Sequence, residues 1–455
     1  MIKNYDDTSI DSIVQYSRSF IDKSFSDVLT EQELNIIFNE ISQYKNNRKG
    51  HFGDLVEKYL FGIENNSDAA PDFSKVGVEL KTTPLKKHPR KMYVAKERLV
   101  FSMINYMNVI HEEWESSSFL KKNKLLLLMF YLYEKDIDLS KYEFKLIHLL
   151  DLLSETSTED IEQIQQDWKT IVNKIKAGEA HLLSEGDTAY LGAATKASTS
   201  KDRRPQPNSD EPAKPRAFSL KQSYLNSLIQ KYLGKEDKEI SSLFNNKSLP
   251  KTIEENIHSR FAPYIGRTNI DIEKELDILY EQRPKSHRRL LVNRILGTKS
   301  NKIEELEKAD ITLRVIALEP SGVLKESISF PKFDYLTIVD EVWEESSFYE
   351  QLTTKRFLFV VFRKQKNGNA ILEKIKFWNF PMKDIDEAQL VWEETVNRIK
   401  SHRAHALPGI KDSPAVHVRP HARNSEDTIP TGYGTYEVKK SFWLNAKYIQ
   451  KQLED

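Results

Sequence analysis

The sequence contains no cysteine, which excludes a disulfide framework and any metal site built from thiolates. A reducing compartment is compatible with this absence. Long apolar runs are also missing. The longest, Leu125–Leu132, is far too short to span a bilayer, so it predicts a buried strand and no membrane partner is expected. The amino-terminal residues lack the apolar core of a signal peptide. Together these features predict a cytoplasmic protein.

Neither sign of charge is in excess, because 68 lysines and arginines balance 68 aspartates and glutamates. Net charge therefore gives no support for a nucleic-acid partner, and such a role must rest on local clusters. The chain also has no glycine-rich phosphate-binding loop, so no use of nucleoside triphosphates is expected. Its 455 residues suffice for two or three domains with real cores.

The stretch Pro71–Lys81 carries the main chemical signal. Apolar and polar residues alternate in it, which puts Glu79 and Lys81 on one face of a strand, about 6–7 Å apart. A turn over residues 74–77 can bring Asp72 beside Glu79. Two carboxylates and an ammonium on one face suit a hard cation such as Mg²⁺ with a water held beside it. The same pattern fits an edge strand whose polar face is only solvated, and the residues alone leave both interpretations open.

Hydrophobic periodicity and turn residues predict the other elements. The polar, proline-rich segment is expected to be a mobile loop until something orders it. The expected elements are helices at 1–45, 55–62 and 158–176, strands at 92–107, 123–133 and around 190–191, a loop at 198–216, and a closing strand or helix at 218–233.

The second half of the chain repeats the first in the same order, which indicates a duplicated domain. The expected limits are 1–237 for the first domain, 238–260 for a linker and 261–455 for the second domain. The matching segments are W-E-S-S-S-F from Trp114 with W-E-E-S-S-F from Trp343, V-N-K-I-K from Val172 with V-N-R-I-K from Val396, Ala180-His181 with Ala404-His405, and K-Q-S-Y-L-N from Lys221 with K-K-S-F-W-L-N from Lys439.

Because the domain is duplicated, the acidic residues of the first half can be compared with the residues at the same positions in the second half. Aligning residues 76–85 with 309–318 keeps the strand pattern but not its acid and lysine. A threonine cannot replace a carboxylate at a cation site, and an arginine is a poor proton acceptor. If the acids of the first half are catalytic, the second copy is a fold without that chemistry, kept for binding. The aligned pairs are Glu57 near Asn293, Asp72 with Glu305, Glu79 with Thr312, and Lys81 with Arg314.

In order along the chain, Lys49-Gly50, Glu57, Pro71-Asp72 and Gly77–Lys81 resemble the active-site series of MutH, the repair nicking endonuclease with the PD-(D/E)xK nuclease fold. With Ala95–Val100, Ser184–Gly186 and Thr195-Lys196 added, the pattern is similar to the longer two-domain restriction enzymes of the Sau-three-A type, which cut GATC. The resemblance covers nearly the whole chain. It implies an α/β fold with a mixed sheet flanked by helices, in two tandem MutH-like domains of which the second is degenerate.

The resemblance further implies a type II restriction endonuclease. Such an enzyme hydrolyses both DNA strands 5′ of the G in GATC and leaves 5′-phosphate ends. Asp72, Glu79 and the backbone carbonyl of Leu80 would hold Mg²⁺, which activates water and neutralises the scissile phosphate. Lys81 would orient or deprotonate the attacking water, and Glu57 would act as an outer carboxylate.

The expected DNA contacts follow from the same resemblance. The Arg-Pro-Lys loop of MutH corresponds to Ala-Thr-Lys at 194–196 in the first copy and to Arg-Pro-His at 419–421 in the second, so only the second copy keeps the arginine. Basic residues near the site would hold phosphates, and side chains in the major groove would read bases. The expected DNA-binding residues are Lys49, Lys122, Lys196, Arg419, Lys439 and Lys440.

Three functional hypotheses remain open at this stage. In the first, the degenerate copy binds a second GATC as an allosteric effector of cleavage by the first copy. In the second, the chain is a MutH-like repair nickase that needs a partner ATPase. In the third, it is a non-catalytic DNA-binding regulator. The expected partner is double-stranded DNA containing GATC, and one catalytic site per chain further suggests a homodimer induced by DNA.

Overall fold

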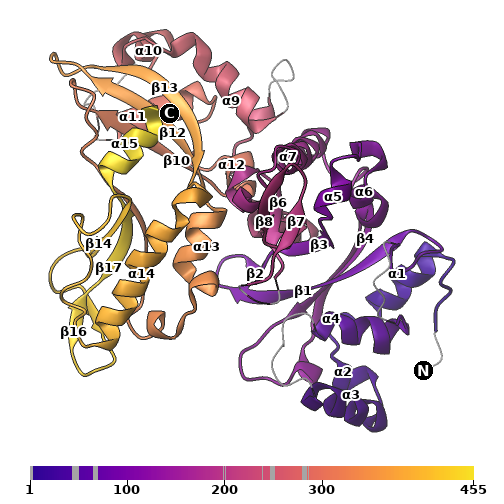
Figure 1. Cartoon of the computed structure of the whole chain (residues 1–455). Helices are drawn as coiled ribbons and strands as arrows, with labels where there is room; N and C mark the ends of the chain where they lie inside the picture. Colours follow the sequence, from indigo (N-terminus) through magenta and orange to yellow (C-terminus); the bar gives the residue numbers. More distant parts are fainter. Residues whose placement is uncertain are drawn as a thin grey trace. The chain divides into compact units, whose positions relative to one another are not determined.

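The computed structural model describes residues 4–43, 51–64, 70–197, 199, 201–237, 239–245, 252–278, 284 and 286–454. The chain divides into two compact units (Figure 1). Unit 1 comprises Met1–His181, Thr188–Ser198 and Asp202–Lys238, and unit 2 comprises Leu182–Asp187, Thr199–Lys201 and Glu239–Asp455. In the described part of the chain, no helix is long and apolar enough to cross a membrane.

Unit 1 is built on a four-stranded mixed sheet in the order β2-β1-β4-β5. The apolar run Leu125–Leu132 forms strand β4, as predicted, and its central residues are fully buried. β4 lies parallel to β1, so that Val78 faces Leu125 and Leu85 faces Leu132. Both faces of a strand must be covered when its side chains are apolar throughout. The sheet strands are β1 (Val78–His88), β2 (Met92–Ala95), β4 (Leu125–Leu132) and β5 (Phe144–Asp151).

Helices cover this sheet, and three of them lie in the segment 1–45, where helices were expected. Helix α7 has the predicted bounds Thr158–Lys176 and begins at Ser157, whose side chain accepts the N–H of Asp160. Trp168 of α7 packs edge-on against Trp114, with ring centroids 5.8 Å apart, so both belong to the core. The helices are α1 (Ile10–Arg18), α2 (Phe25–Val28), α3 (Glu31–Gln43), α4 (His51–Leu55), the π-helix η1 (Val56–Phe61), α5 (Tyr106–Val109), α6 (Ser118–Asn123), α7 and α8 (Gln222–Tyr232).

A second sheet of unit 1 has the order β3-β9-β6, and a hairpin, β7-β8, accompanies it. Two expectations are wrong here. The segment 92–107 holds two strands and the start of α5 rather than one strand, and 198–216 holds the hairpin rather than a loop. The hairpin turns at Asn208, whose φ is 58°, and buried Gln206 ties it down by accepting the N–H of Ala180 at 2.7 Å. The strands are β3 (Leu99–Met103), β6 (Leu191–Thr195), β7 (Arg204–Gln206), β8 (Ser209–Ala213) and β9 (Arg216–Leu220).

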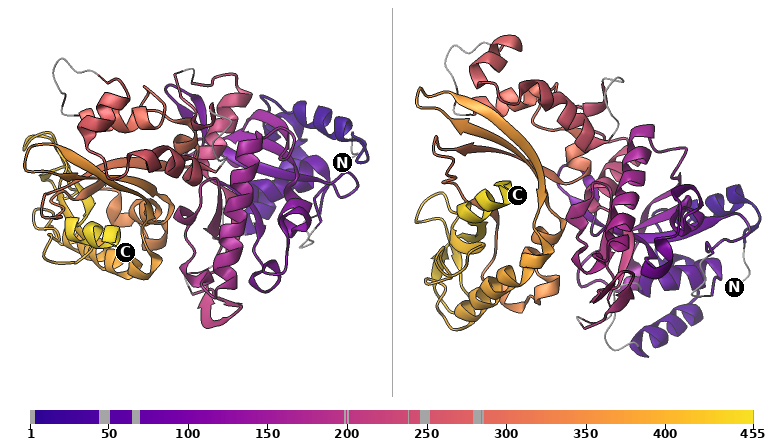
Figure 2. Two further views of the ribbon diagram at one scale, coloured as in Figure 1. Left: turned by 90° about the horizontal axis from the view of Figure 1, so that it is seen from above. Right: turned by 45° about the horizontal axis from the view of Figure 1, so that its top comes forward.

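Unit 2 contains the counterpart of the first sheet. Strand β10 (Ile311–Leu318) lies parallel to β12 (Arg356–Lys364), which is antiparallel to β13 (Ala370–Asn379). Figure 2 shows the long curved strands with helix α15 (Ala446–Glu454) beside them, and Trp378 of β13 donates to Gln452 of that helix at 3.1 Å. The other helices are α9 (Ile253–Phe261), α10 (Asn269–Glu275), α11 (His287–Ile295), α12 (Glu304–Lys308), α13 (Ser347–Thr354) and α14 (Ile385–Lys400).

Unit 2 also repeats the second sheet, in the order β11-β17-β14, and its hairpin β15-β16 corresponds in chain order to β7-β8. One proposed sequence match is wrong. Residues 221–226 begin helix α8, whereas residues 439–445 run along β17, and strand pairing matches β17 with β9 instead. Lys440 therefore corresponds to Arg216, not to Lys221. The strands are β11 (Ile328–Lys332), β14 (Val416–Pro420), β15 (Thr428–Pro430), β16 (Tyr436–Val438) and β17 (Lys440–Leu444).

Candidate active site

A tight turn before β1 brings Asp72 beside the strand. The N–H groups of Val76 and Gly77 both donate to the carbonyl of Phe73, at 3.1 and 2.9 Å. Gly77 has a φ of 71°, in the left-handed region that a residue without a Cβ adopts at little cost. Phe73 then pairs with Val78, and the chain reverses into β1. The turn predicted at residues 74–77 therefore forms.

Three of the predicted site residues contact one another. Oδ2 of Asp72 accepts the N–H of Leu80 at 2.9 Å, and Oε2 of Glu79 accepts the N–H of Asp72 at 3.3 Å. Nζ of Lys81 lies 2.5 Å from Oε1 of Glu79. Nζ of Lys122, at the end of α6, lies 3.7 Å from the same oxygen. Glu79 is 1% exposed, so its carboxylate is held inside the unit between two ammonium groups.

The backbone of Leu80 also faces this cluster. The amide and carbonyl of one strand residue point to the same side of the strand. Since the Leu80 N–H points to Asp72, its carbonyl points to the same edge. That edge is open at this point because β2 pairs with β1 only from Leu85 to His88. The Asp72 carboxylate, the Glu79 carboxylate and the Leu80 carbonyl thus provide oxygen donors on one side of β1.

Glu57 comes to the cluster from the π-helix η1, Val56–Phe61. The Ile63 N–H donates to the Glu57 carbonyl, six residues back, whereas in unit 2 the Thr298 N–H donates to the Asn293 carbonyl, five residues back. Unit 1 therefore has one extra residue in this turn, which is how a π-bulge arises, often at a functional site. The spacing also supports the predicted pairing of Glu57 with Asn293.

Burial and mutual repulsion raise the pKa values of two acids in this cluster. Burial raises the pKa of Glu57 to about 7, the nearby carboxylates of Asp72, Asp54 and Glu79 add to this, and only Lys81 opposes it. Burial also raises the pKa of Glu79, against the opposing effect of Lys81. The raised pKa values of Glu57 and Glu79 fit a site for a hard divalent cation, which would stabilise the ionised carboxylates. Among the described residues no group of three or more His, Cys, Asp or Glu side chains already forms a metal cage, so Asp72 and Glu79 would bind it with the Leu80 carbonyl.

The corresponding edge of unit 2 lacks these acids. The pairing of Leu80 with Leu127 in unit 1 matches that of Leu313 with Leu358 in unit 2, which puts Thr312 at the position of Glu79. The carboxylate of Glu305, which aligns with Asp72, is turned away and accepts the hydroxyl of Ser242 at 2.5 Å. The expected loss of the acids in the second copy therefore has a structural counterpart.

The basic residues expected to bind DNA have different surroundings. Lys49 lies outside the described residues. Lys122 faces the acid cluster. Lys196 is exposed just after β6, and its N–H donates to the Pro215 carbonyl at 2.8 Å. In unit 2 the His421 N–H makes the equivalent bond at 2.8 Å, so the predicted alignment of residues 194–196 with 419–421 agrees with the hydrogen bonding.

The three candidates in unit 2 also differ in their accessibility. Arg419 is exposed, and its guanidinium lies over the ring of Trp443, 3.8 Å from the centroid. Lys439 is half-buried and pairs with Asp427. Lys440 is 7% exposed and donates to the Ala404 carbonyl at 2.5 Å, so its ammonium faces the protein interior and could reach DNA only after a rearrangement.

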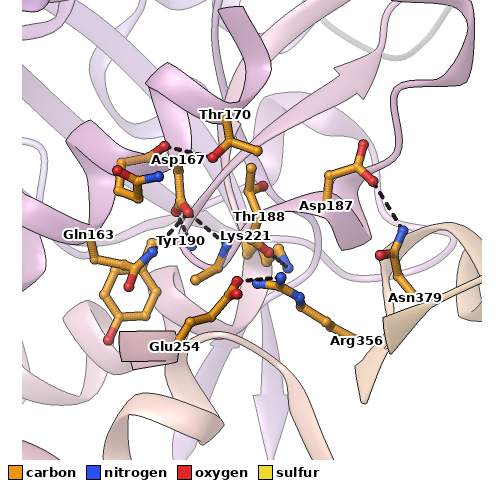
Figure 3. Close-up of polar contacts among 12 residues, drawn as sticks. Gln163, Asp167, Thr170, Asp187, Thr188, Tyr190, Lys221, Glu254, Arg356 and Asn379 are labelled. Atoms are coloured by element: carbon orange, nitrogen blue, oxygen red, sulfur yellow. Dashed lines mark hydrogen bonds and ion pairs between the residues drawn. The ribbon is translucent and has the colours of Figure 1, made fainter. Parts of the chain in front are cut away.

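Asp167, which the sequence did not single out, positions the second sheet of unit 1 (Figure 3). This buried residue of α7 accepts the N–H groups of Ala189, Tyr190 and Leu191 at 2.9, 2.5 and 2.9 Å. It thereby fixes the start of β6, the strand that ends next to Lys196. The available signal was an acid on the apolar face of a helix, next to Trp168 and on the same stripe as Ile164.

Residues 61–167 match the family described as MutH, DNA mismatch repair enzyme. Over 460 aligned residues the chain is 34% identical to the type II restriction enzyme Sau3AI of Staphylococcus aureus, covering 90% of this chain and 93% of that enzyme. It is also 26% identical to the DNA mismatch repair protein MutH of Shewanella woodyi, and 28% identical to that of Shewanella baltica, in each case over 41% of this chain. These matches cover 78% and 81% of the two MutH proteins.

The match to the restriction enzyme and the match to the MutH family both agree with the fold. The site-bearing strand β1 and both flanking lysines, Lys81 and Lys122, fall within the MutH-like segment, and the similarity to the restriction enzyme extends through both units. Restriction endonucleases act on DNA and generally use a divalent metal ion. The chain belongs to the family of type II restriction enzymes, site-specific deoxyribonucleases, with a MutH-like nuclease domain in its first half.

Proposed function

We propose that the chain makes double-strand breaks at GATC, cutting 5′ of the G and leaving 5′-phosphate ends, with Mg²⁺ as its cofactor. In this proposal residues 1–237 are the catalytic domain, 238–260 the connecting segment and 261–455 the degenerate DNA-binding domain. In the structure the described part of the connecting segment, including most of α9, belongs to unit 2. The observation that carries the proposal is the contact of Asp72, Glu79 and Lys81 at the open edge of β1. The GATC target rests on the resemblance of the whole residue series to enzymes that cut this sequence.

The positions of the side chains support the following reaction. Asp72, Glu79 and the Leu80 carbonyl would hold the cation, which would neutralise the scissile phosphate and lower the pKa of a bound water. Lys81, fixed 2.5 Å from Glu79, orients the attacking water and stabilises the negative charge that develops on the oxygens of the phosphorane. The water oxygen bonds to phosphorus, the bond between phosphorus and the 3′ oxygen breaks, and that oxygen takes a proton from a solvent water as it leaves. Glu57, whose pKa is raised to about 7, accepts the proton of the attacking water through the surrounding solvent.

Single substitutions test this assignment. Asp72→Ala or Lys81→Ala should slow single-turnover cleavage of a GATC duplex by at least about a hundredfold, because each removes a charge that acts in the transition state. Lys87→Ala is the matched control, since Lys87 is an exposed lysine of the same strand that pairs with Glu134. Cleavage by Asp72→Ala or Lys81→Ala at the rate of this control would contradict the catalytic assignment. Sequencing the product ends tests GATC and the cut position.

The second unit is proposed to bind another GATC and promote cleavage by the first. Arg419, exposed and stacked on Trp443, supports this role, since arginine on an aromatic face is presented to solvent in a fixed position. Plasmids with two sites should be cut faster than plasmids with one. Added GATC oligonucleotide should accelerate the slow cleavage of the one-site plasmid. Equal rates that no oligonucleotide changes would remove the effector role.

The presence of the acids in only one unit also favours a second candidate. One catalytic set can cut one strand at a time, so a chain that acts alone would nick DNA, as a MutH-like repair nickase does. Double-strand cutting by the purified chain, with DNA-induced homodimers in sedimentation experiments, would exclude the nickase. A lack of cleavage of every DNA in Mg²⁺ would instead favour a non-catalytic regulator.

A further inference from the structure

Unit 2 has a pocket where its sheet corresponds to the catalytic edge of unit 1. The pocket has a volume of about 240 Å³. Its lining consists of Arg289, Asn301, Ile303, Leu306, Glu307, Asp310 and residues 311–313 of β10. This volume is smaller than that of pockets that enclose drug-sized ligands, so the pocket could hold one small chemical group of a larger molecule.

Arg289 occupies the position that corresponds to the cation site. Its Nη1 donates to the Leu313 carbonyl at 3.2 Å, and Leu313 has the same place in the strand register as Leu80. The Leu80 carbonyl is the backbone ligand proposed for the divalent cation. In unit 2 a guanidinium of the chain itself therefore lies beside the equivalent carbonyl.

The charges near the pocket also differ from those of the acid cluster in unit 1. Arg314, which aligns with Lys81, is close enough to act electrostatically on Arg289, and burial together with this like charge lowers the pKa of the Arg289 guanidinium. Two carboxylates line the pocket, but Asp310 is paired with Lys355 at 2.5 Å and Glu307 is exposed to solvent. Because Asp310 is already paired, the guanidinium groups of Arg289 and Arg314 outweigh the remaining Glu307 carboxylate and favour an anion.

We propose that this pocket binds a phosphodiester group of duplex DNA directly through Arg289 and Arg314, with no divalent metal. The proposal rests on the proposed DNA-binding function of unit 2 and names the group that this unit recognises. In unit 1 a phosphate approaches three carboxylates and needs a cation between them. In unit 2 the guanidinium takes the place of that cation, so binding there is separated from hydrolysis.

The test measures DNA binding without metal. In an Asp72→Ala background, which removes cleavage, a fluorescent duplex with one GATC is titrated in EDTA and followed by anisotropy. The parent should bind under these conditions, and Arg289→Ala should weaken binding about tenfold and lower the salt slope by about 0.9, as expected for one lost phosphate contact. Arg294→Ala is the control, because Arg294 is exposed on the same helix, α11.

A second variant keeps the test decisive if Arg289→Ala destabilises unit 2. Thr312→Glu keeps the bond of Arg289 to Leu313 and adds a carboxylate beside the guanidinium, so it should weaken binding in EDTA to a similar extent. Loss of all binding of the parent in EDTA, or equal affinities of Arg289→Ala, Thr312→Glu and Arg294→Ala, would overturn the proposal. Cleavage that does not respond to a second site would remove the effector role alone and leave an Arg289-dependent contact standing.

Discussion

Glu57 should make the metal-free protein less stable as the pH rises, and Glu57→Gln should remove this effect. The side chain lies half-buried in the π-helix, and its pKa is raised from 4.5 to about 7. The cause is burial first, then the charges around it. The groups that face it are Asp72, Lys81, Asp54 and Glu79, of which only Lys81 favours its ionised form.

The sign follows from proton binding. The folded chain holds this proton more tightly than the unfolded chain, so the free energy of unfolding falls as the pH rises from about 4.5 to about 7 and stays lower above it. A rise in pKa from 4.5 to about 7 corresponds to roughly 3 kcal/mol. Solvent screening of a half-buried group reduces this to on the order of 1–2 kcal/mol. Glutamine keeps the shape without the charge.

Thermal unfolding in EDTA at pH 5 and pH 8 measures the effect. At pH 8 Glu57→Gln should raise the transition of unit 1 by about 2–8 °C, and the difference from the parent should shrink at pH 5. Glu64→Gln is the control, since Glu64 is exposed just after the same π-helix. A Glu57→Gln protein whose stability relative to the parent is the same at both pH values would refute the reasoning. Mg²⁺ should narrow the difference, because the cation stabilises the ionised parent.

Three more predictions concern positions around the site. Gly77→Ala should cost about 1–2 kcal/mol, because φ is 71° there, and should slow cleavage by moving Asp72; thermal unfolding and single-turnover rates measure the two effects. Asp167→Asn should cost about 1–3 kcal/mol, since one of its three backbone N–H partners loses its acceptor, and should weaken DNA binding through β6 in an anisotropy titration. Lys440→Met should also cost about 1–3 kcal/mol, by leaving the Ala404 carbonyl unpaired, yet leave DNA affinity unchanged; a large loss of affinity would restore Lys440 as a DNA contact.

Elements with strong local patterns could be predicted from the sequence. The apolar run Leu125–Leu132 and the periodic segment Thr158–Lys176 form β4 and α7 at the expected bounds. A strand buried on both faces requires a continuous apolar run, and a helix buried on one face requires apolar residues at every third or fourth position, so both patterns can be recognised in the sequence. The turn at 74–77 was also predictable, since a glycine beside a segment of alternating apolar and polar residues often marks a turn before a strand.

Features that depend on distant hydrogen bonds were not predictable. Residues 204–213 are polar and rich in proline, yet they form a hairpin because Gln206 bonds to Ala180, far away in sequence. The match of residues 221–226 with 439–445 rested on shared letters, whereas strand pairing, which sets the true correspondence, is visible only in three dimensions. A π-bulge is likewise a one-residue insertion that composition does not reveal.

The residues at the edge of β1 and at the edge of β10 differ in how much they destabilise the folded protein. Glu79 is 1% exposed, and burying a carboxylate there is unfavourable until a cation or the two lysines balance it. Thr312 at the same register carries no such cost, and the Arg289 guanidinium satisfies the Leu313 carbonyl without a metal. Loss of the acids from unit 2 therefore removes a cost to stability while it keeps positive charge at the position where a phosphate would bind. If the acids of unit 1 are catalytic and unit 2 binds DNA, as proposed, a second copy can in this way lose hydrolysis and retain binding.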